Sequence, residues 1–417
     1  MKIKQGRLWT QIINQTFADF TVYELGGSCC TRYQKNDKVY IKEINKSVEG
    51  IENGYIKFLN EVQHMIKANE KFVGFYPQIL QINEDSNMYS VELEYCYNGT
   101  TLADLMRNEI VDTKYFEYSF EYMLDILLER FFIRKKNIVP NSDYIKDNYI
   151  QRIIRRIEDI YKLDIENKYG FSNTLLAINQ NGFFLNGEYY PPILNYIKYI
   201  SKDDELMNRL NITFNTESHH DLIPSNILVK ADTFNRINDF KLIDPRGEGE
   251  TGEENRHFMY DLGKMLLGID TLDIFRIFNG KLEKKLYKFN KNGKKAGIYT
   301  FDLRFLVDNP VLNKYIKSND LFWKIINKHS SRKESILSCE KNIQLKLLFS
   351  QACMYHPDIS CRIIFEKDEE LALCMYLRGS MMMRNFMDYY YGIDPLRNKN
   401  NLSRITLWPS VDEKENV

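Results

Sequence analysis

The chain has no excess of either charge and no long apolar run. Its 417 residues include 57 Lys and Arg and 57 Asp and Glu, so the formal net charge is zero. No global field attracts it to nucleic acid or acidic lipid, and we expect neither as a partner. No stretch reaches the roughly eighteen apolar residues of a membrane helix. The best candidate, "LALCMYLRGSMMM", is interrupted by Arg378, so no membrane span is predicted.

Signals for export are also lacking. The first residues, "MKIKQGRLWTQIINQTF", include basic residues but no apolar core of the kind a signal peptide has. The seven cysteines show no regular disulfide framework. We therefore expect a cytoplasmic protein. The adjacent Cys29 and Cys30 are interpreted as small residues in a tight loop, with a redox pair as the alternative.

The chain contains no repeats and no Pro- or Ser-rich linker, which favours lobes in contact. Residues 1–97 predict a small α+β lobe, because "FTVYEL" and "KVYIKEI" alternate like strands and residues 54–69 have helical apolar spacing. Two more strands, "YPQILQIN" and "MYSVELEYC", complete this lobe. Residues 98–417 predict a larger, mainly helical lobe. The expected class is α+β, with a small antiparallel-sheet lobe and a helical lobe.

Three long helices are expected early in the helical lobe, at "YFEYSFEYMLDILLERFF", "DYIKDNYIQRIIRRIEDIY" and "ILNYIKYISKDDELMNRL". Asn-Gly pairs favour tight hairpin turns. They predict one hairpin in "AINQNGFFLNGEYYPP" and another around Asn292-Gly293. The Met-rich stretch near Met375 and Met382 is interpreted as core packing, with a binding surface as the alternative.

The central functional question is the stretch "SHHDLIPSNILV". His219, Asp221 and a later His257 could form the iron site of a non-haem oxygenase. Such a site lies within a β-barrel, with strands on both sides of the motif. The hundred or so residues before it are helical in pattern, and His257 precedes a helix. Iron binding is therefore kept only as a remote alternative.

Phosphoryl transfer explains the same stretch better. Asp221 can orient the acceptor hydroxyl and take its proton. Asn226, five positions later, and Asp244, after the strand "FKLI", offer an amide and a carboxylate oxygen for Mg²⁺. The motif alone is suggestive, because its residue types recur by chance in roughly 2% of such chains. Its partners elsewhere in the chain decide the matter.

Those partners occur in the order that a nucleotide site requires. Gly26, Gly27 and Ser28 form a loop that can approach phosphate closely. Lys42 on the next strand can reach the α- and β-phosphates, and Glu61 on the following helix can hold it. The strand before "YNG" can offer backbone groups to the base near Glu94 and Cys96. The expected cofactors are ATP, with GTP possible, and Mg²⁺.

This set of motifs resembles the aminoglycoside phosphotransferase and choline kinase family, within the protein-kinase-like fold. The matching segments are "ELGGSCCTRY", "KVYIKEI", "FLNEVQHM", "VELEYCYNGTTL", "SHHDLIPSNILV", "FKLIDPRG" and "YDLGKM", between about residues 21 and 268. The resemblance implies that His219 and Asp261 brace the catalytic loop. "IDPRG" before "YDLGK" is also similar to kinase-like proteins encoded in bacterial surface-polysaccharide loci.

Two departures argue against a protein kinase. His220 stands where protein kinases carry Arg, and Pro245 and Arg246 follow Asp244 in place of Phe-Gly. The long segment of about 103–210 predicts an inserted acceptor pocket. The expected function is a kinase that phosphorylates a hydroxyl of a sugar, amino-sugar or amino-alcohol. The alternative is a nucleotide-binding pseudokinase or scaffold.

Overall fold

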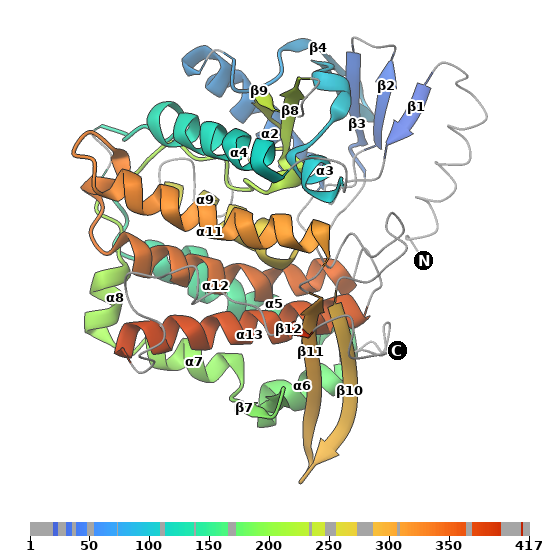
Figure 1. Ribbon diagram of the computed structural model, residues 1–417. Helices are drawn as coiled ribbons and strands as arrows, with labels where there is room; N and C mark the ends of the chain where they lie inside the picture. The colour runs from blue at the N-terminus through green and yellow to red at the C-terminus, as the bar shows by residue number, and fades with distance from the viewer. Residues whose placement is uncertain are drawn as a thin grey trace. The chain divides into compact units, whose positions relative to one another are not determined.

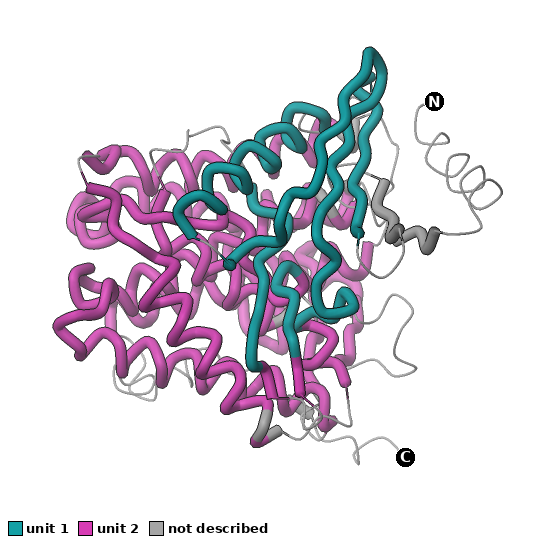
Figure 2. The backbone as a smooth tube through the Cα atoms, turned by 90° about the horizontal axis from the view of Figure 1, so that it is seen from above, with its two compact units in different colours: residues 1–102, 226–230, 238–253 teal, residues 103–225, 231–237, 254–417 magenta. Residues whose placement is uncertain are grey.

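The computed structural model describes residues 20–23, 31–35, 39–47, 54–72, 74–108, 113–136, 139–165, 172–232, 236–246, 256–272, 287–306, 309–363, 369–392 and 410–411. The chain forms two compact units, coloured teal and magenta in Figure 2. Unit 1 comprises Met1–Leu102, Asn226–Lys230 and Asn238–Glu253. Unit 2 comprises Ala103–Ser225, Ala231–Ile237 and Glu254–Val417.

Unit 1 is built on a five-stranded antiparallel sheet in the order β1-β2-β3-β5-β4. Its elements are β1 (Phe20–Tyr23), β2 (Thr31–Lys35), β3 (Val39–Asn45), α2 (Gly54–Lys71), β4 (Ile79–Glu84) and β5 (Met88–Glu94). Alternate residues of β5, namely Tyr89, Val91 and Leu93, are buried, as the two-residue period of a strand requires. Helix α2 buries a stripe that includes Phe58 and Val62.

A hairpin from the middle of the sequence also belongs to unit 1, except for Ala231 and Ile237 near its tip. It consists of β8 (Ile227–Ala231) and β9 (Ile237–Leu242). The N–H of Leu242 donates to the carbonyl of Phe75 at 2.7 Å, and the N–H of Val229 donates to that of Thr100 at 2.9 Å. These two bonds join the hairpin to the segments around β4 and β5. Asn226 and Asp244, just outside its two strands, are therefore carried by unit 1.

Unit 2 is mainly helical (Figure 1). Its helices are α3 (Leu102–Arg107, with its first residue in unit 1), α4 (Thr113–Ile126), α5 (Gln151–Ile165), α6 (Ser172–Asn181), α7 (Ile193–Ile200), α8 (Asp204–Leu210), α9 (Phe258–Leu267), α11 (Pro310–Ser330), α12 (Ile343–Cys361) and α13 (Glu369–Tyr391). The π-helical turn Leu127–Phe131 continues α4, and the π-helical turn Lys146–Ile150 leads into α5. Together the two units confirm the expected α+β class, with an antiparallel N-terminal sheet and a mainly helical remainder.

The third helix expected from the sequence is in fact two helices. Helix α7 ends at Ile200 and α8 begins at Asp204. The side chain of Asp203 accepts the N–H of Leu206 at 2.9 Å and so caps α8. An aspartate that satisfies a backbone donor of the first turn favours a new start over a continuous helix.

Unit 2 contains a sheet of its own, with the strand order β10-β11-β6-β7. The expected hairpin at Asn186 and Gly187 is confirmed between β6 (Phe183–Leu185) and β7 (Glu188–Tyr190). The second expected hairpin is also present, but its turn does not lie at Asn292-Gly293 as predicted. That pair lies inside β10 (Tyr287–Lys295), at an irregularity in the register. The turn to β11 (Ile298–Leu306) is made by Ala296 and Gly297, with φ of 51° and 83°.

The Met-rich stretch packs in the core of unit 2, which confirms its interpretation as core packing. Met375 and Met382 on α13 are both buried. Arg378, which interrupts the apolar run in the sequence, is also buried and forms an ion pair with Asp270 at 2.7 Å. Within the described ranges, no helix is both long and apolar enough to cross a bilayer.

Candidate active site

Lys42 is the centre of a buried charged cluster in unit 1. It lies on β3 opposite Val91 of β5, and its side chain is 1% exposed. Its Nζ forms an ion pair with Glu61 on α2 and a second one, at 3.0 Å, with Oδ1 of Asp244. The Nζ also lies 5.1 Å from the ring centre of Phe58. A buried ammonium between two carboxylates is costly to desolvate, and both partners are needed to offset that cost.

Glu61 reaches Lys42 because of its place on α2. Phe58, Val62 and Met65 are buried at the i, i+4 and i+7 positions, and Glu61 lies beside this stripe. Its side chain is 7% exposed. The pair predicted from a strand lysine and a helix glutamate nineteen residues later is therefore brought into contact. The structure adds Asp244 as a second partner of Lys42, from a point 202 residues further along the chain.

Asn226 and Asp244, the expected magnesium ligands, lie next to each other at the base of the β8–β9 hairpin. The N–H of Ile243 donates to the carbonyl of Asn226 at 3.0 Å, and Asp244 follows directly. Asp244 has a φ of 57°, the left-handed region that few non-glycine residues adopt. Such strained backbone is often found at functional sites. One carboxylate and one amide oxygen fit Mg²⁺, which takes few protein ligands and completes its shell with phosphates and water.

The residues expected to flank an adenine lie at the end of β5. The N–H of Glu94 donates to the Gln78 carbonyl at 2.9 Å. Its carboxylate also accepts the N–H of Gln78 at 3.3 Å. Cys96 is buried, and burial raises the pKa of its thiol to about 12. That thiol stays protonated near neutral pH, which excludes it as a nucleophile. Gly26, Gly27 and Ser28 lie outside the described residues.

The loop that carries His219 and Asp221, in unit 2, is held by α9. Asp261, fully buried on α9, accepts the hydroxyl of Ser218 at 2.8 Å and the N–H of His219 at 2.6 Å. Burial raises the pKa of Asp261 to about 7, against the opposing effect of these loop donors and of Arg256. The resemblance assigned Asp261 to bracing this loop, and Asp261 contacts the loop at Ser218 and His219.

Lys264, one turn further along α9, contacts the expected base itself. Its Nζ lies 3.1 Å from Oδ1 of Asp221, and its side chain is 3% exposed. Sequence reasoning did not assign Lys264. A signal was present, because Lys264 follows Asp261 by three positions and so shares its helix face. The distance of 43 residues between Asp221 and Lys264 hid the contact.

Gly268 follows α9 directly, as the first residue of the π-helical turn Gly268–Leu272, and meets Pro224. A Cβ at Gly268 would lie 2.2 Å from the Cδ of Pro224. Positions 261, 264 and 268 correspond to i, i+3 and i+7, which is one side of a helix. The loop from Ser218 to Pro224 therefore contacts α9 at Asp261 and Lys264, and the turn after α9 at Gly268.

The histidines of the motif have structural partners. The Nδ1 of His219 accepts the N–H of Asp221 at 3.3 Å. His220 has a φ of 62° and its ring stacks on Tyr260, with centroids 4.7 Å apart. His257 uses Nδ1 to accept the N–H of Met259, and its Nε2 lies 3.2 Å from Glu340. In the part of the chain that the structure describes, no three His, Cys, Asp or Glu residues are grouped to hold a metal, so the iron alternative gains no support.

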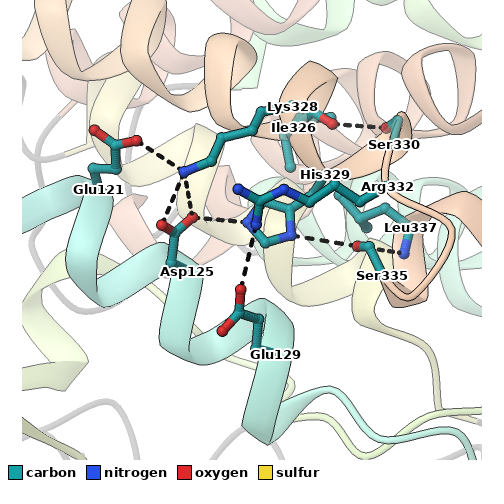
Figure 3. Close-up of polar contacts among 10 residues, drawn as sticks. All are labelled: Glu121, Asp125, Glu129, Ile326, Lys328, His329, Ser330, Arg332, Ser335 and Leu337. Carbon is teal, nitrogen blue, oxygen red and sulfur yellow. Dashed lines mark hydrogen bonds and ion pairs between the residues drawn. The ribbon is translucent and has the colours of Figure 1, made fainter.

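A Ser-His-Asp set lies elsewhere in unit 2 (Figure 3). The Nε2 of His329 is 2.7 Å from Oδ1 of Asp125, and the hydroxyl of Ser335 is 3.4 Å from the His329 Nδ1. Burial alone would raise the pKa of Asp125, but bonds from His329 and Lys328 outweigh it and lower the pKa. The Oγ of Ser335 accepts the N–H of Leu337 and caps a short helix. We interpret these residues as a structural hydrogen-bond network that connects α4 and α11.

The comparisons with known proteins add little. No family model matches the sequence, and no curated protein matches it. One solved structure that is similar belongs to a candidate fructosamine-3-kinase from Haemophilus somnus 129PT. The two chains share 9% identity with a TM-score of 0.37, over 91% of this chain and 96% of the other. A likeness this weak carries no weight for the chemistry, which is argued from the residues themselves.

Proposed function

We propose that this chain is a kinase that transfers the γ-phosphoryl group of ATP, or GTP, to a hydroxyl of a small acceptor. The observation that carries the proposal is the buried contact of Lys42 with Glu61 and Asp244. A lysine held between two carboxylates in this way is expensive as a structural device. It is the arrangement needed to fix an ammonium for nucleotide phosphates beside a carboxylate that can bind a metal.

Each residue then has a defined task. Lys42 binds the α- and β-phosphates, and Glu61 keeps its ammonium in place. Asn226 and Asp244 would hold Mg²⁺, which neutralises phosphate charge when bound. Asp221 accepts the proton of the acceptor hydroxyl as its oxygen attacks the γ-phosphorus. Asp221 and Asn226 are five positions apart, so a short stretch of chain connects the base to the metal ligands.

The acceptor class is proposed as a sugar, amino-sugar or amino-alcohol. Support comes from the long segment before the catalytic loop, which forms helices α3 to α8 and the β6–β7 hairpin. A protein kinase needs far less chain there. The proposed branch, kinase-like proteins of bacterial surface-polysaccharide loci, rests on "IDPRG" and "YDLGK" in the sequence.

The test is to incubate the purified protein with Mg-ATP and fractionated metabolites, and to identify phosphorylated products by mass spectrometry. Asp221→Asn should abolish product formation while nucleotide binding, measured by calorimetry, persists. Full turnover by Asp221→Asn would refute the assignment of the base. Tight Mg-ATP binding by the wild type without any product would favour the pseudokinase alternative.

A further inference from the structure

Helix α9 carries a lysine that packing does not explain. Every residue of Phe258–Leu267 is buried. Apart from Asp261 and Lys264, these residues carry no charged side chain, and apolar residues such as Leu262 and Met265 would fill the space of Lys264 at lower desolvation cost. Both charged side chains contact the same loop, Asp261 at its start and Lys264 at Asp221.

We propose that Lys264 is the positioning residue of the base Asp221, an inference that rests on the proposed function. The ammonium of Lys264 holds Oδ1 of Asp221 at 3.1 Å and so fixes the direction of the carboxylate. An opposite charge at this distance also favours the ionised form of a carboxyl group. A general base must be ionised before it can accept a proton, so Lys264 keeps Asp221 ready for reaction.

Lys264 also acts after the transfer. The acceptor oxygen forms a bond to the γ-phosphorus, the bond from that phosphorus to the bridging oxygen breaks, and the nucleoside diphosphate leaves with the electron pair. The proton of the acceptor hydroxyl moves to Asp221. The neighbouring ammonium then favours loss of this proton to solvent, which restores the carboxylate for the next turnover.

Other charged groups meet the loop at different points. His219 accepts the backbone N–H of Asp221 through Nδ1. Arg256 donates to the carbonyl of Ser218 at 3.3 Å. Asp261 accepts from Ser218 and His219. These contacts fix the backbone of the loop, whereas Lys264 contacts the carboxylate that we assign as the base.

The kinetic test compares Lys264→Met and Lys264→Arg with the wild type. General-base catalysis contributes a factor of about 10²–10⁴. Loss of the positioning contact should therefore lower kcat by about tenfold to a hundredfold, with the KM for Mg-ATP nearly unchanged. The acid side of the pH–kcat profile should move to higher pH in Lys264→Met. Lys264→Arg keeps the charge and should recover most of the activity at neutral pH.

A matched control is Lys346→Met, which removes another buried lysine of unit 2 from its ion pair with Glu340. It should lower stability yet leave the pH profile in place. Asp261→Asn is measured beside it, because Asp261 has a pKa of about 7 and could itself shape the profile. Unchanged kcat and pH profile in Lys264→Met would overturn the inference.

A second readout does not depend on turnover. Carbodiimide and glycinamide label protonated carboxyl groups, and peptide mass spectrometry reports labelling of Asp221 at each pH. The midpoint for Asp221 should move to higher pH in folded Lys264→Met and stay near that of the wild type in Lys264→Arg and Lys346→Met. If the wild type transfers no phosphate, the proposed function fails, and this measurement still decides whether Lys264 controls Asp221. An unshifted midpoint refutes the inference. If Lys264→Met does not fold, Lys264→Gln replaces it.

Discussion

Gly268 and Pro224 are in van der Waals contact so close that no side chain fits between them. An added Cβ would lie 2.2 Å from the Pro224 Cδ. We predict that Gly268→Ala displaces Pro224 and, with it, the end of the catalytic loop. Overpacking of this kind costs about 1–3 kcal/mol of unfolding free energy. Phosphoryl transfer per folded molecule should fall well below that of the wild type.

The control is Gly263→Ala on α9, the helix that ends just before Gly268. A Cβ added at Gly263 would lie 2.0 Å from the Oγ of Ser350 on α12. It would therefore disturb α12 and not the loop. Denaturant unfolding should show a comparable loss of stability for both variants. Only Gly268→Ala should lower kcat after correction for the folded fraction. Equal kcat values in the two variants would show that the Pro224 contact does not control the loop.

Lys42→Met should be strongly destabilising. It leaves Glu61 and Asp244 as buried or half-buried carboxylates without their cation. Removal of one partner from a buried ion pair costs about 3–5 kcal/mol. Lys46→Met, just after the same strand, is the matched control, because Lys46 pairs with the exposed Glu84 and its loss should change the unfolding free energy little. Similar urea midpoints for the two variants would contradict the prediction.

Asp261 should make stability depend on pH near neutrality. Its pKa is about 7 in the folded protein, against an ordinary value of 3.8 that applies to the unfolded chain. Between these values the unfolded state has released the proton that the folded state keeps, so the unfolding free energy falls as pH rises from about 4 to 7. Asp261→Asn should lack this component, and Asp143→Asn, at an exposed site, should retain it. Urea unfolding at several pH values measures the slopes.

The β10–β11 turn offers a stabilising substitution. Ala296 adopts a φ of 51° before Gly297, a conformation that costs most L-residues energy but suits asparagine. Ala296→Asn should raise the unfolding free energy by about 0.5–1 kcal/mol. Gly297→Ala, which places a side chain at a φ of 83°, should have the opposite sign. Thermal unfolding of both variants separates this turn effect from general changes in polarity.

Local patterns predicted most elements, and tertiary contacts explain the failures. Strand alternation located β3 and β5, and helical spacing located α2. The Asn292-Gly293 pair is a strong turn signal, yet the pairing of Tyr287 with Phe305 and of Lys291 with Phe301 places the turn four residues later. The strand pairing of β10 with β11 outweighs the local turn preference of the Asn-Gly pair. The division between α7 and α8 could have been read from Asp203, a residue type that begins helices.

In the candidate site, too, some contacts could be predicted from the sequence and others could not. Lys42 and Glu61 could be paired from the sequence because a strand and the helix that follows it are local neighbours. The contact of Asp244 with Lys42 joins segments 202 residues apart, and no spacing rule reports it. For Lys264 the spacing to Asp261 indicates a shared helix face, but the partner Asp221 lies on a loop and cannot be read from that spacing.

Asp261, Lys264 and Gly268 all contact the loop from Ser218 to Pro224. The shape of the loop therefore depends on the spacing of these three positions around the helix axis. Each residue added to an α-helix turns the positions after it by about 100°. A single residue inserted between Asp261 and Lys264 would keep the first anchor and rotate Lys264 and Gly268 away together. Homologous chains that diverge in sequence can therefore change most of α9, but we expect them to conserve the number of residues between these three positions.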